Sequence, residues 1–570
     1  MAQPPLFATA SRRAQMFPVL EPGDIDRMAR FGETVSYPAR ERIVTAGALS
    51  PGLIVLHSGR IAVTYSGEGA PNNGVSDESA IIVTHEARQF MGELAQLSDR
   101  PSLVNADTLE PVEGFVIRAD RLRDLIVQEA ELGERIMRAL ILRRVGLLES
   151  GRSGPIIIGR ADHPDVIRLQ GFLSRNGQPY HALDSDSDSC AKTLIGRFHI
   201  DPDHLPIVLC ANGKLLRNPS ENELARCIGL VRPIDTDKLY DVAIVGAGPA
   251  GLAAAVYAAS EGLSVIVLDC RAFGGQAGAS ARIENYLGFP TGIGGLALMA
   301  RAHNQAQKFG VEMAIPDQAH RLEMRSDQEF SRYFLDLGNG EKVQSRAVVL
   351  ATGVRYRRPD VANLAAFEGS SVHYWASPIE LRLCDGHEVA LVGAGNSAGQ
   401  AAVYLASRVK KVTLLARGAS LRSSMSHYLV ERILAQPNIE VLTRSEITSL
   451  QGGGGNLESV CWRDETGETT QVIRHLFLFI GAEPNTDWLA ECDVALDEKG
   501  FIRTGAGTGA ASHPLETSLP GVFAIGDVRS GSVKRVAAAV GEGAQVVAAL
   551  HIHLAAGSFS PIAPSTAEKN

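Results

Sequence analysis

The chain has 570 residues and a mass of 60.8 kDa. With about 150 residues per domain, this length predicts roughly three to five folded units. A hydrophobic content of 45%, a charged content of 21% and a mean hydropathy of +0.02 are typical of a globular chain and exclude a collagen, a coiled coil and a largely disordered protein. The net charge of −9 argues against nucleic acid or an anionic membrane as the main partner, because either would favour a basic face.

The cysteines are few and widely spaced, and no Cys-x-x-Cys motif occurs in the sequence. This spacing excludes a disulfide scaffold and a zinc ribbon, and we predict no metal site. The N-terminus has no apolar segment of signal-peptide length, and no uninterrupted apolar run approaches about 18 residues. We therefore expect a cytoplasmic protein with reduced thiols and no membrane partner. The seven cysteines are Cys190, Cys210, Cys227, Cys270, Cys384, Cys461 and Cys492.

A first domain is predicted over residues 14–150. Short alternating apolar segments punctuated by glycine predict a small β-barrel or β-roll. An amphipathic pattern from Ala119 to about Leu148 then predicts one long helix, which ends in the flexible composition of residues 149–154. The strands are predicted at 34–37, 42–44, 53–57, 60–65, 80–84 and 114–117.

A second domain is predicted over residues 155–231, with the order β-α-β-α-β-β-α. Its last two strands flank Asn212-Gly213, a pair that favours a tight hairpin turn. The strands are predicted at 155–159, 180–184, 206–210 and 214–216, and the best-defined helices at 166–173 and 221–230.

From residue 239 the pattern strand, glycine turn, helix occurs twice. A glycine turn of this kind lets backbone N–H groups and a helix N-terminus bind a pyrophosphate, and an acid on the second strand binds a ribose hydroxyl. Asp269 ends the second strand, 23 residues after Gly246, so the strand, helix and acid together favour dinucleotide binding over an ordinary glycine-rich turn. The residues of the first turn are Gly246, Gly248, Pro249, Ala250 and Gly251.

The second glycine turn lacks the acid. Its second strand, residues 412–415, is followed by Arg417 and Arg422. An acid would repel a 2′-phosphate, whereas guanidinium groups bind it, so the second turn favours NADPH over NADH. Two ordinary solvated arginines are the alternative. The residues of this turn are Gly393, Gly395, Asn396, Ser397 and Ala398.

Residues 240–554 resemble the low-molecular-weight thioredoxin reductases over more than half of the chain. The motifs that carry the resemblance are, in family order, Val245-Gly-Ala-Gly-Pro-Ala-Gly-Leu252, Gly274-Gly-Gln276, Ile283-Glu-Asn-Tyr286, Ala351-Thr-Gly353, Phe479-Ile-Gly-Ala-Glu-Pro-Asn485 and Val522-Phe-Ala-Ile-Gly-Asp527. The resemblance implies two Rossmann-like (βαβ) domains: an FAD domain at 239–356 and 485–556, and an NAD(P)H domain at 357–484. It also implies a homodimer.

The same resemblance assigns further residues to FAD. The segment that follows Gly526-Asp527 would run under the isoalloxazine ring, and Gly526-Asp527 itself would bind the ribityl and phosphate side of the flavin. The residues implied beyond the first glycine turn and Asp269 are Gly275, Gln276, Asn285, Thr352, Gly353, Gly526, Asp527, Arg535, Val536 and Ala537.

The sequence departs from the family where the redox cysteines belong. In thioredoxin reductases a Cys-Ala-Thr-Cys pair follows a Val-x-Tyr strand, but here Val372-His-Tyr374 is followed by Trp375-Ala-Ser-Pro378. Cys384 is interpreted as a single thiol on the approach to the next strand, and a lone thiol cannot cycle through an internal disulfide. Trp375 is either close to the flavin or an ordinary core tryptophan. No side chain is assigned as catalytic.

Residues 155–231 resemble a thioredoxin or glutaredoxin fold without its cysteines. Leu205-Pro206 before a strand is similar to the cis-proline turn of that fold, but the active-site position is Arg160-Ala-Asp-His-Pro164. Cys190, Cys210 and Cys227 are predicted on other elements, as structural residues.

Residues 14–150 resemble a cyclic-nucleotide-binding β-roll, at 51–60 and at 90–97. In that family the backbone of Gly92 and Leu94 would bind the cyclic phosphate, and Glu93 the ribose. The position of the phosphate-binding arginine is Ser102, with Arg100 two residues earlier. Loss of that contact weakens binding roughly tenfold to hundredfold unless Arg100 replaces it. A docking or regulatory module without a nucleotide is the alternative.

The fold class is therefore multidomain: a β-roll with helices, a thioredoxin-like α/β domain and a two-dinucleotide-binding flavoprotein. The expected function is transfer of a hydride from NADPH to FAD and on to an unidentified acceptor, a small molecule or a redox protein, without an internal redox disulfide. Two alternatives stay open. One is a sensor or docking module, regulated by its flavin or by a ligand, with little turnover. The other is a thioredoxin-disulfide reductase with an atypical route.

Overall fold

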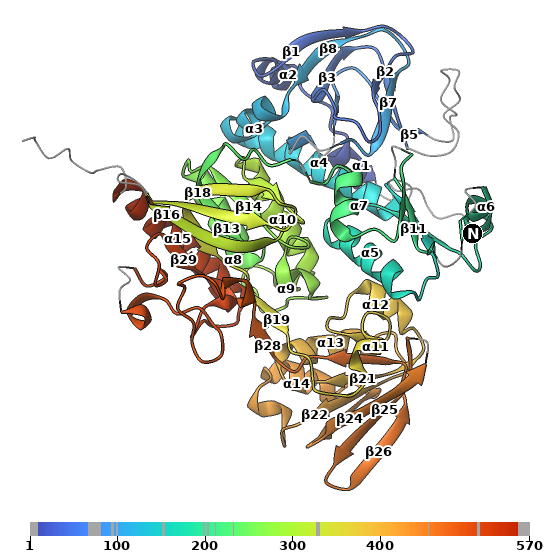
Figure 1. Ribbon diagram of the computed structural model, residues 1–570. Helices are drawn as coiled ribbons and strands as arrows, with labels where there is room; N and C mark the ends of the chain where they lie inside the picture. The colour runs from blue at the N-terminus through green and yellow to red at the C-terminus, as the bar shows by residue number, and fades with distance from the viewer. Residues whose placement is uncertain are drawn as a thin grey trace, which may run out of the picture. The chain divides into compact units, whose positions relative to one another are not determined.

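The computed structural model describes residues 10–65, 81–92, 96–97, 101–150, 154–197, 200–201, 204–210, 213–231, 233–326, 331–453, 455–509 and 513–556 (Figure 1). These residues form two compact units. The first consists of residues 1–232 with 307–310, and the second of residues 233–306 with 311–570. The division into four domains made from the sequence stays a prediction.

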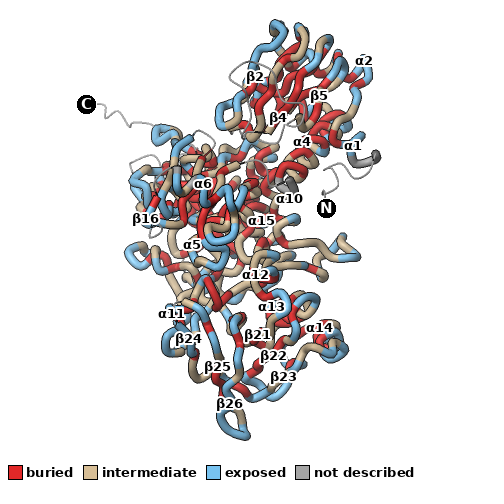
Figure 2. The backbone as a smooth tube through the Cα atoms, turned by 90° about the vertical axis from the view of Figure 1, so that its right-hand side faces the viewer, coloured by how far each residue is buried: buried red, intermediate tan, exposed pale blue. Residues whose placement is uncertain are grey.

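The first unit begins with α1 (Ala10–Met16) and α2 (Pro22–Ala29), followed by a roll of two four-stranded antiparallel sheets. One sheet has the order β1 (Glu33–Tyr37), β8 (Val112–Ile117), β3 (Leu53–Ser58), β6 (Phe90–Met91), and the other β2 (Arg42–Val44), β7 (Val104–Thr108), β4 (Ile61–Tyr65), β5 (Ile81–His85). Their inner faces are buried (Figure 2). The predicted β-roll is confirmed, although the polar Asn105 and Asp107 obscured β7 in the sequence pattern.

The predicted single helix after the roll is wrong, because it divides into α3 (Ala119–Gln128) and α4 (Ala130–Ser150). The chain bends at Glu129, where φ is −110° and ψ is 82°. Arg27 and Arg30 of the α2 region both pair with the Glu129 carboxylate. Gly133 permits the bend, since a Cβ atom at this position would lie 2.6 Å from the carbonyl oxygen of Ile126.

The rest of the first unit is a four-stranded mixed sheet with helices. The sheet order is β10 (His181–Asp184), β9 (Ile156–Gly159), β11 (Ile207–Leu209), β12 (Leu215–Arg217), and β9 is parallel to β10 and antiparallel to β11. The helices are α5 (Pro164–Arg175), α6 (Ser189–Arg197) and α7 (Glu221–Cys227). The element order is as predicted and the Leu205–Pro206 peptide is cis. Its relation to thioredoxin stays a prediction.

The expectation of reduced thiols is wrong for one pair, because Cys210 and Cys227 form a disulfide. Cys210 follows β11 and Cys227 ends α7, and the packing of α7 on the sheet brings their Cα atoms to 6.6 Å, within disulfide reach. Cys210 is buried, as predicted. The two residues are 17 positions apart in the sequence, so only the packing of these elements pairs them.

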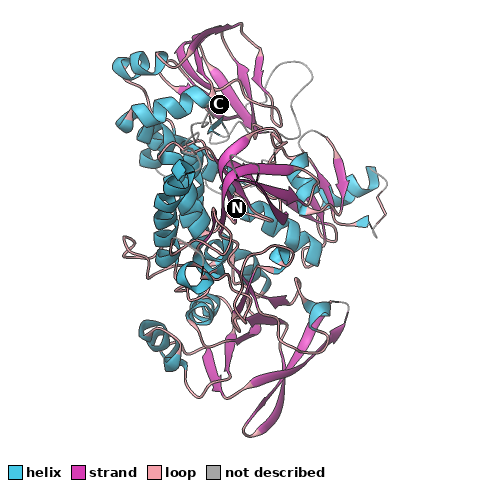
Figure 3. Ribbon diagram, turned by 60° about the vertical axis from the view of Figure 1, so that its left-hand side comes forward, coloured by secondary structure: helices cyan, strands magenta, loops and turns pink. Residues whose placement is uncertain are grey.

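The second unit contains two mostly parallel sheets (Figure 3). In the first, the parallel strands are β15 (Glu312–Ala314), β14 (Val265–Leu268), β13 (Leu239–Val245), β18 (Lys342–Leu350) and β29 (Val522–Ala524), and β17 (Ser331–Leu337) and β16 (Ala319–Ser326) extend the sheet antiparallel from β18. Two helices, α8 (Pro249–Ser260) and α15 (Val536–Ala556), share one apolar core with one face of this sheet.

The second parallel sheet has the order β20 (Val372–His373), β27 (His475–Leu478), β21 (Glu388–Val392), β22 (Lys411–Ala416), β23 (Ile439–Thr443). It packs with α13 (Asn396–Ala406) and α14 (His427–Leu434). An antiparallel sheet of β24 (Glu446–Gly453), β25 (Asn456–Asp464) and β26 (Gly467–Val472) follows β23. The chain enters and leaves this region through the paired strands β19 (Val354–Tyr356) and β28 (Ala482–Pro484).

By length and composition alone, residues 536–555 of α15 could cross a membrane. In this fold α15 packs against α8, and Val546, Val547 and Leu550 are buried in the core that the two helices share with the first sheet. The helix is therefore a core element of the second unit.

Two glycines of α15 test this packing. A Cβ atom at Gly543 would lie 2.6 Å from the carbonyl oxygen of Ala250 in α8, whereas a Cβ atom at Gly541 would meet nothing within 4 Å. We expect Gly543→Ala to destabilise the protein by about 1–3 kcal/mol through overpacking. Gly541→Ala is the matched control and should be neutral or stabilising by up to about 1 kcal/mol. Thermal unfolding of the full chain measures both, and equal effects would contradict the proposed packing.

Candidate active site

The first glycine turn connects β13 to α8. Gly246 has φ +113°, and a Cβ atom there would lie 2.2 Å from the carbonyl oxygen of Ala351. A Cβ atom on Gly251 would lie 1.9 Å from the carbonyl oxygen of Gly246. Both positions therefore require glycine, and the predicted fingerprint is explained by the close approach of α8 to the strand ends.

A second glycine turn faces the first. Gly274 and Gly275 have φ of +97° and +53°, and the Gly274 N–H donates to the carbonyl oxygen of Ala247 at 2.7 Å. A Cβ atom on Gly275 would lie 3.2 Å from the Cα of Gly248, so side chains on these turns would fill the space between them. Gly248 is also the N-cap of α8, and the helix N-terminus favours an anion there. The turns fit a pyrophosphate.

Asp269 ends β14, where it stabilises the first turn. One carboxylate oxygen accepts from the Ala247 N–H at 2.9 Å, and the other accepts from the N–H groups of Arg271 and Ala272 at 3.0 and 3.2 Å. Each carboxylate oxygen has a second lone pair. The predicted ribose contact of Asp269 stays a prediction.

Gly526 and Asp527 follow β29 and lie beside α8. Gly526 has φ +72°, and a Cβ atom there would lie 2.9 Å from the Cβ of Ala250. Burial raises the pKa of Asp527, an effect that Lys534 partly opposes. Among the described residues no hydrogen bond is formed to the Asp527 carboxylate, so this acceptor fits the hydroxyl groups of a ribityl chain.

Glu542, which no pattern in the sequence had identified, holds this last turn. Its carboxylate accepts from the Gly526 N–H at 2.6 Å and from the Arg529 guanidinium at 2.5 Å. Glu542 lies on α15, 16 residues after Gly526, and no local signal connects the two.

The remaining residues predicted to bind FAD lie at several places in the second unit. The Gln276 side chain donates to the carbonyl oxygen of Val354 at 2.6 Å, and the Thr352 hydroxyl donates to that of Asn485 at 2.9 Å. Both bonds therefore tie the turns to the β19–β28 connection. Asn285 is exposed in the loop before α10 (Gly295–Lys308). Gly353 follows Thr352, and Arg535, Val536 and Ala537 form the start of α15.

The predicted NADPH turn connects β21 to α13. Gly393 has φ +145°, and a Cβ atom there would lie 2.5 Å from the carbonyl oxygen of Phe479 and 3.1 Å from the Cβ of Ala398. Gly395 is the N-cap of α13, and a Cβ atom on it would meet nothing within 4 Å. Asn396 accepts from the Ser426 N–H at 2.7 Å, and Ser397 follows it in the first turn of the helix. The opening at Gly395 fits a phosphate at a helix N-terminus.

The two arginines predicted to bind the 2′-phosphate differ in their surroundings. Arg417 follows β22 and is exposed, and among the described residues it has no hydrogen bond or ion pair. Arg422 pairs with Glu431 at 2.8 Å, and both side chains are more than half exposed. Arg417 is thus the stronger candidate, because Arg422 must first leave its partner.

The segment after β20, which replaces the family's cysteine pair, is held by hydrogen bonds. The Trp375 indole donates to Glu380 at 3.1 Å, and Glu380 also accepts from the Ser377 N–H at 2.9 Å in a capping box that begins α12 (Pro378–Leu383). The Arg271 guanidinium lies 5.6 Å from the centre of the Trp375 ring. Cys384, at the end of α12, is buried, and burial raises the pKa of its thiol. The Ser-x-x-Glu pattern could have predicted this cap.

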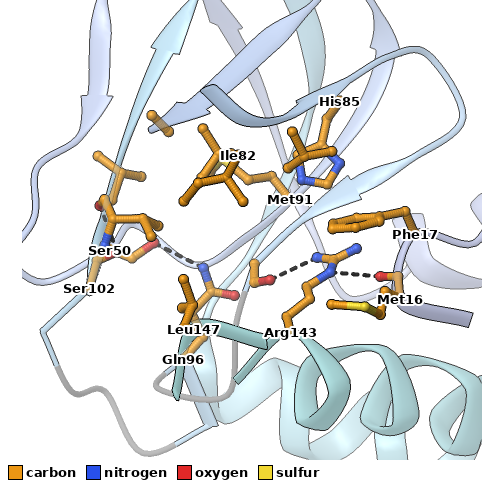
Figure 4. A pocket seen from close by; sticks show the side chains of 16 residues that line it. Met16, Phe17, Ser50, Ile82, His85, Met91, Gln96, Ser102, Arg143 and Leu147 are labelled. Atoms are coloured by element: carbon orange, nitrogen blue, oxygen red, sulfur yellow. Dashed lines mark hydrogen bonds between the residues drawn. The ribbon is translucent and has the colours of Figure 1, made fainter. Parts of the chain in front are cut away.

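The β-roll contains a cavity of about 60 Å³ (Figure 4). Gly92 and Ser102, which were assigned to a cyclic nucleotide from the sequence, both line it. The Ser102 hydroxyl donates to the carbonyl oxygen of Val104 at 2.9 Å. The other candidates of this group, Glu93, Leu94 and Arg100, lie outside the described residues.

Family comparisons match two parts of the chain. A model described as pyridine nucleotide-disulphide oxidoreductase matches residues 240–543, and one described as cyclic nucleotide-binding domain matches residues 34–129. An alkyl hydroperoxide reductase from Pseudomonas putida is 33% identical over 323 residues, which are 56% of this chain and 59% of that protein. A thioredoxin reductase from Treponema pallidum (strain Nichols) is 33% identical over 318 residues, 55% of this chain and 95% of that protein.

Solved structures agree with these matches. The thioredoxin reductase of Lactococcus lactis, in its FR conformation, has a TM-score of 0.51 and 26% identity over 56% of this chain and 99% of its own. The thioredoxin reductase of T. acidophilum has a TM-score of 0.51 and 29% identity over 57% of this chain and its full length. The predicted two-dinucleotide-binding fold and its resemblance to thioredoxin reductases are thereby confirmed.

Substitution of Arg417 tests the second glycine turn. We expect Arg417→Met to raise the KM for NADPH roughly tenfold or more while the KM for NADH stays the same, because a charge-assisted contact contributes about 1.5–3 kcal/mol. Steady-state kinetics with both nucleotides measure this difference. Arg408→Met, at an exposed arginine of the same region, is the control. An equal rise for both nucleotides, or none, would contradict the assignment.

Proposed function

Because the chain belongs to the pyridine nucleotide-disulphide oxidoreductase family, we propose that it is an FAD-dependent oxidoreductase that uses NADPH to reduce an acceptor that reaches the flavin directly. The observation that supports this most is the contrast within the second unit. Two glycine turns at helix N-termini leave space at Gly248 and Gly395, whereas the position of the dithiol holds Trp375 and Ser377. The flavin when bound supplies hydride acceptance and electron release, so no nucleophilic side chain is required.

The residues around the first turn bind and orient the flavin cofactor. The N-terminus of α8 and the facing glycines bind the pyrophosphate, and Asp269 keeps the first turn in shape through the Ala247 N–H. Asp527 accepts hydrogen bonds from the ribityl hydroxyls, since its carboxylate is partly desolvated and has no other acceptor role among the described residues. Glu542 fixes the backbone of that turn.

The residues around the second turn bind the nicotinamide cofactor. The N-terminus of α13 at Gly395 binds the pyrophosphate, and Arg417 binds the 2′-phosphate and so selects NADPH. The side chain of Asn396 positions the segment 424–426 beside this turn through the Ser426 N–H.

The route by which electrons leave lacks the cysteine pair of the family. Between residues 357 and 484 the only cysteines are Cys384, buried at the end of α12, and Cys461, buried on β25. Because the two lie on separate elements and Cys384 is held as a thiol, we infer that a small molecule or a redox protein takes electrons from the flavin. Trp375 is proposed to lie beside that acceptor. The cytoplasmic location and the homodimer inferred from the sequence belong to the same proposal.

Reduction of the flavin in the absence of these thiols tests the proposal. We expect anaerobic NADPH to bleach the flavin absorbance of both the native protein and a Cys384→Ala, Cys461→Ala variant. Turnover with ferricyanide or a quinone should agree within about twofold, because neither thiol touches the reaction. Loss of turnover in the variant, with normal flavin content and Tm, would contradict it. Failure of NADPH to reduce the flavin of the native protein would favour a sensor.

The Cys210–Cys227 disulfide supports a second candidate function, a thiol route of electron exit. Two electrons and two protons would convert this disulfide into two thiols, and the thiols could then reduce a disulfide of a partner. Cys227 is only partly buried, so one sulfur of the pair is open to attack. The pair lies on β11 and α7 and not at the predicted active-site position 160–164.

A double variant separates the two candidates. If the disulfide is the exit, Cys210→Ser, Cys227→Ser abolishes NADPH-dependent reduction of a disulfide dye and keeps the ferricyanide activity. The exposed Cys190→Ser is the matched control and changes neither activity. Unchanged dye reduction in the double variant would overturn the thiol route and leave the direct route as the explanation.

A further inference from the structure

The cavity of the β-roll is mostly apolar. Strands from the second sheet of the roll form much of its wall, and α4 closes it from another side (Figure 4). Its volume of about 60 Å³ corresponds to about two water molecules in the liquid. A cyclic nucleotide is several times larger than this space. The apolar wall includes Val44, Val63, Ile82, Val83, Val104 and Leu147.

Arg143 of α4 brings a buried cation to this cavity. Its Nε donates to the carbonyl oxygen of Met16 at 2.8 Å and its Nη1 to that of Gly92 at 2.7 Å. The guanidinium also lies 5.0 and 4.6 Å from the ring centres of Phe17 and Phe90. No carboxylate pairs with Arg143 anywhere in the described part of the chain, and Nη2 makes no hydrogen bond there.

A buried cation without an anion is costly, and two carbonyl groups and two rings compensate only in part. The burial lowers the pKa of Arg143 to about 9, which reflects this cost. An anion bound next to the guanidinium would remove it. Most buried arginines have such a partner within their own chain, so an external anion explains why none is found here.

Two further polar atoms of the wall lack partners. The Nδ1 atom of His85 and the Oε1 atom of Gln96 are buried and unpaired, and both side chains line the cavity. Burial lowers the pKa of His85 well below its usual value, and the charge of Arg143 adds to this effect, so His85 is neutral. Arg143 is thus the only permanent charge among the described lining residues.

We propose that the cavity binds a short-chain apolar carboxylate, with its carboxylate on Arg143 and its hydrocarbon part against the valines and Leu147. A guanidinium binds a carboxylate through two parallel hydrogen bonds, and the apolar wall gains free energy from burial of the hydrocarbon. A cyclic nucleotide fits less well. Ser102 stands at the position of the phosphate-binding arginine, and its hydroxyl already donates to Val104. This inference is independent of the proposed redox function.

Calorimetric titration of the full-length, flavin-loaded protein with isovalerate tests the proposal. We expect one site per chain, and at least tenfold weaker binding of the neutral isostere isovaleramide, because it offers no charge to Arg143. Arg143→Met should weaken isovalerate at least tenfold, and Arg143→Lys should restore part of the loss. Arg138→Met removes an exposed arginine of the same helix that pairs with Glu134, and it should change nothing.

The comparison of the acid with its amide uses the native protein alone, so the test survives if Arg143→Met fails to fold. Equal affinity for isovalerate and isovaleramide, or no binding of isovalerate, would overturn the proposal. So would binding of cyclic AMP that displaces isovalerate at lower concentration. Unchanged isovalerate affinity in a folded Arg143→Met variant would overturn the role of the arginine.

Discussion

The second unit depends on the close contact between α8 and the ends of the central strands. Gly251 approaches the carbonyl oxygen of Gly246, Gly246 approaches Ala351, and Gly543 of α15 approaches Ala250. A single methyl group at any of these points would separate the helix from the sheet. The contact aims the N-terminus of α8 at the space between the two glycine turns, and this geometry permits an anionic cofactor to bind.

The same unit keeps the way in for electrons and alters the way out. Both glycine turns have the open N-caps that phosphates require, at Gly248 and at Gly395. After β20, however, the hydrogen bonds of Trp375 and Ser377 to Glu380 stabilise a short capped helix in place of a cysteine pair. The reduced flavin therefore needs another acceptor, and the disulfide of the first unit is the alternative that the fold itself provides.

Helix α4 connects the two parts of the first unit through neighbouring arginines. Arg143 faces the cavity of the β-roll, whereas Arg144 donates to the carbonyl oxygen of Gly177 at 3.1 Å and to Gln178 at 2.9 Å. Successive residues of a helix point about 100° apart, so one helix contacts the ligand cavity and the α5–β10 loop at the same level. A ligand that shifts Arg143 would thus act on a helix that both parts share.

Local periodicity and glycine at fixed spacings were sufficient to predict the β-roll, the glycine turns and the two-sheet flavoprotein architecture. The missing Cys-x-x-Cys was also visible in the sequence. Which distant groups meet depends instead on tertiary packing: Cys210 with Cys227, Glu542 with Gly526, and Arg143 with the cavity. The same packing divides the predicted helix at Glu129, where arginines from the α2 region pair with the bend. Such contacts arise from the packing of whole elements, which no local pattern specifies.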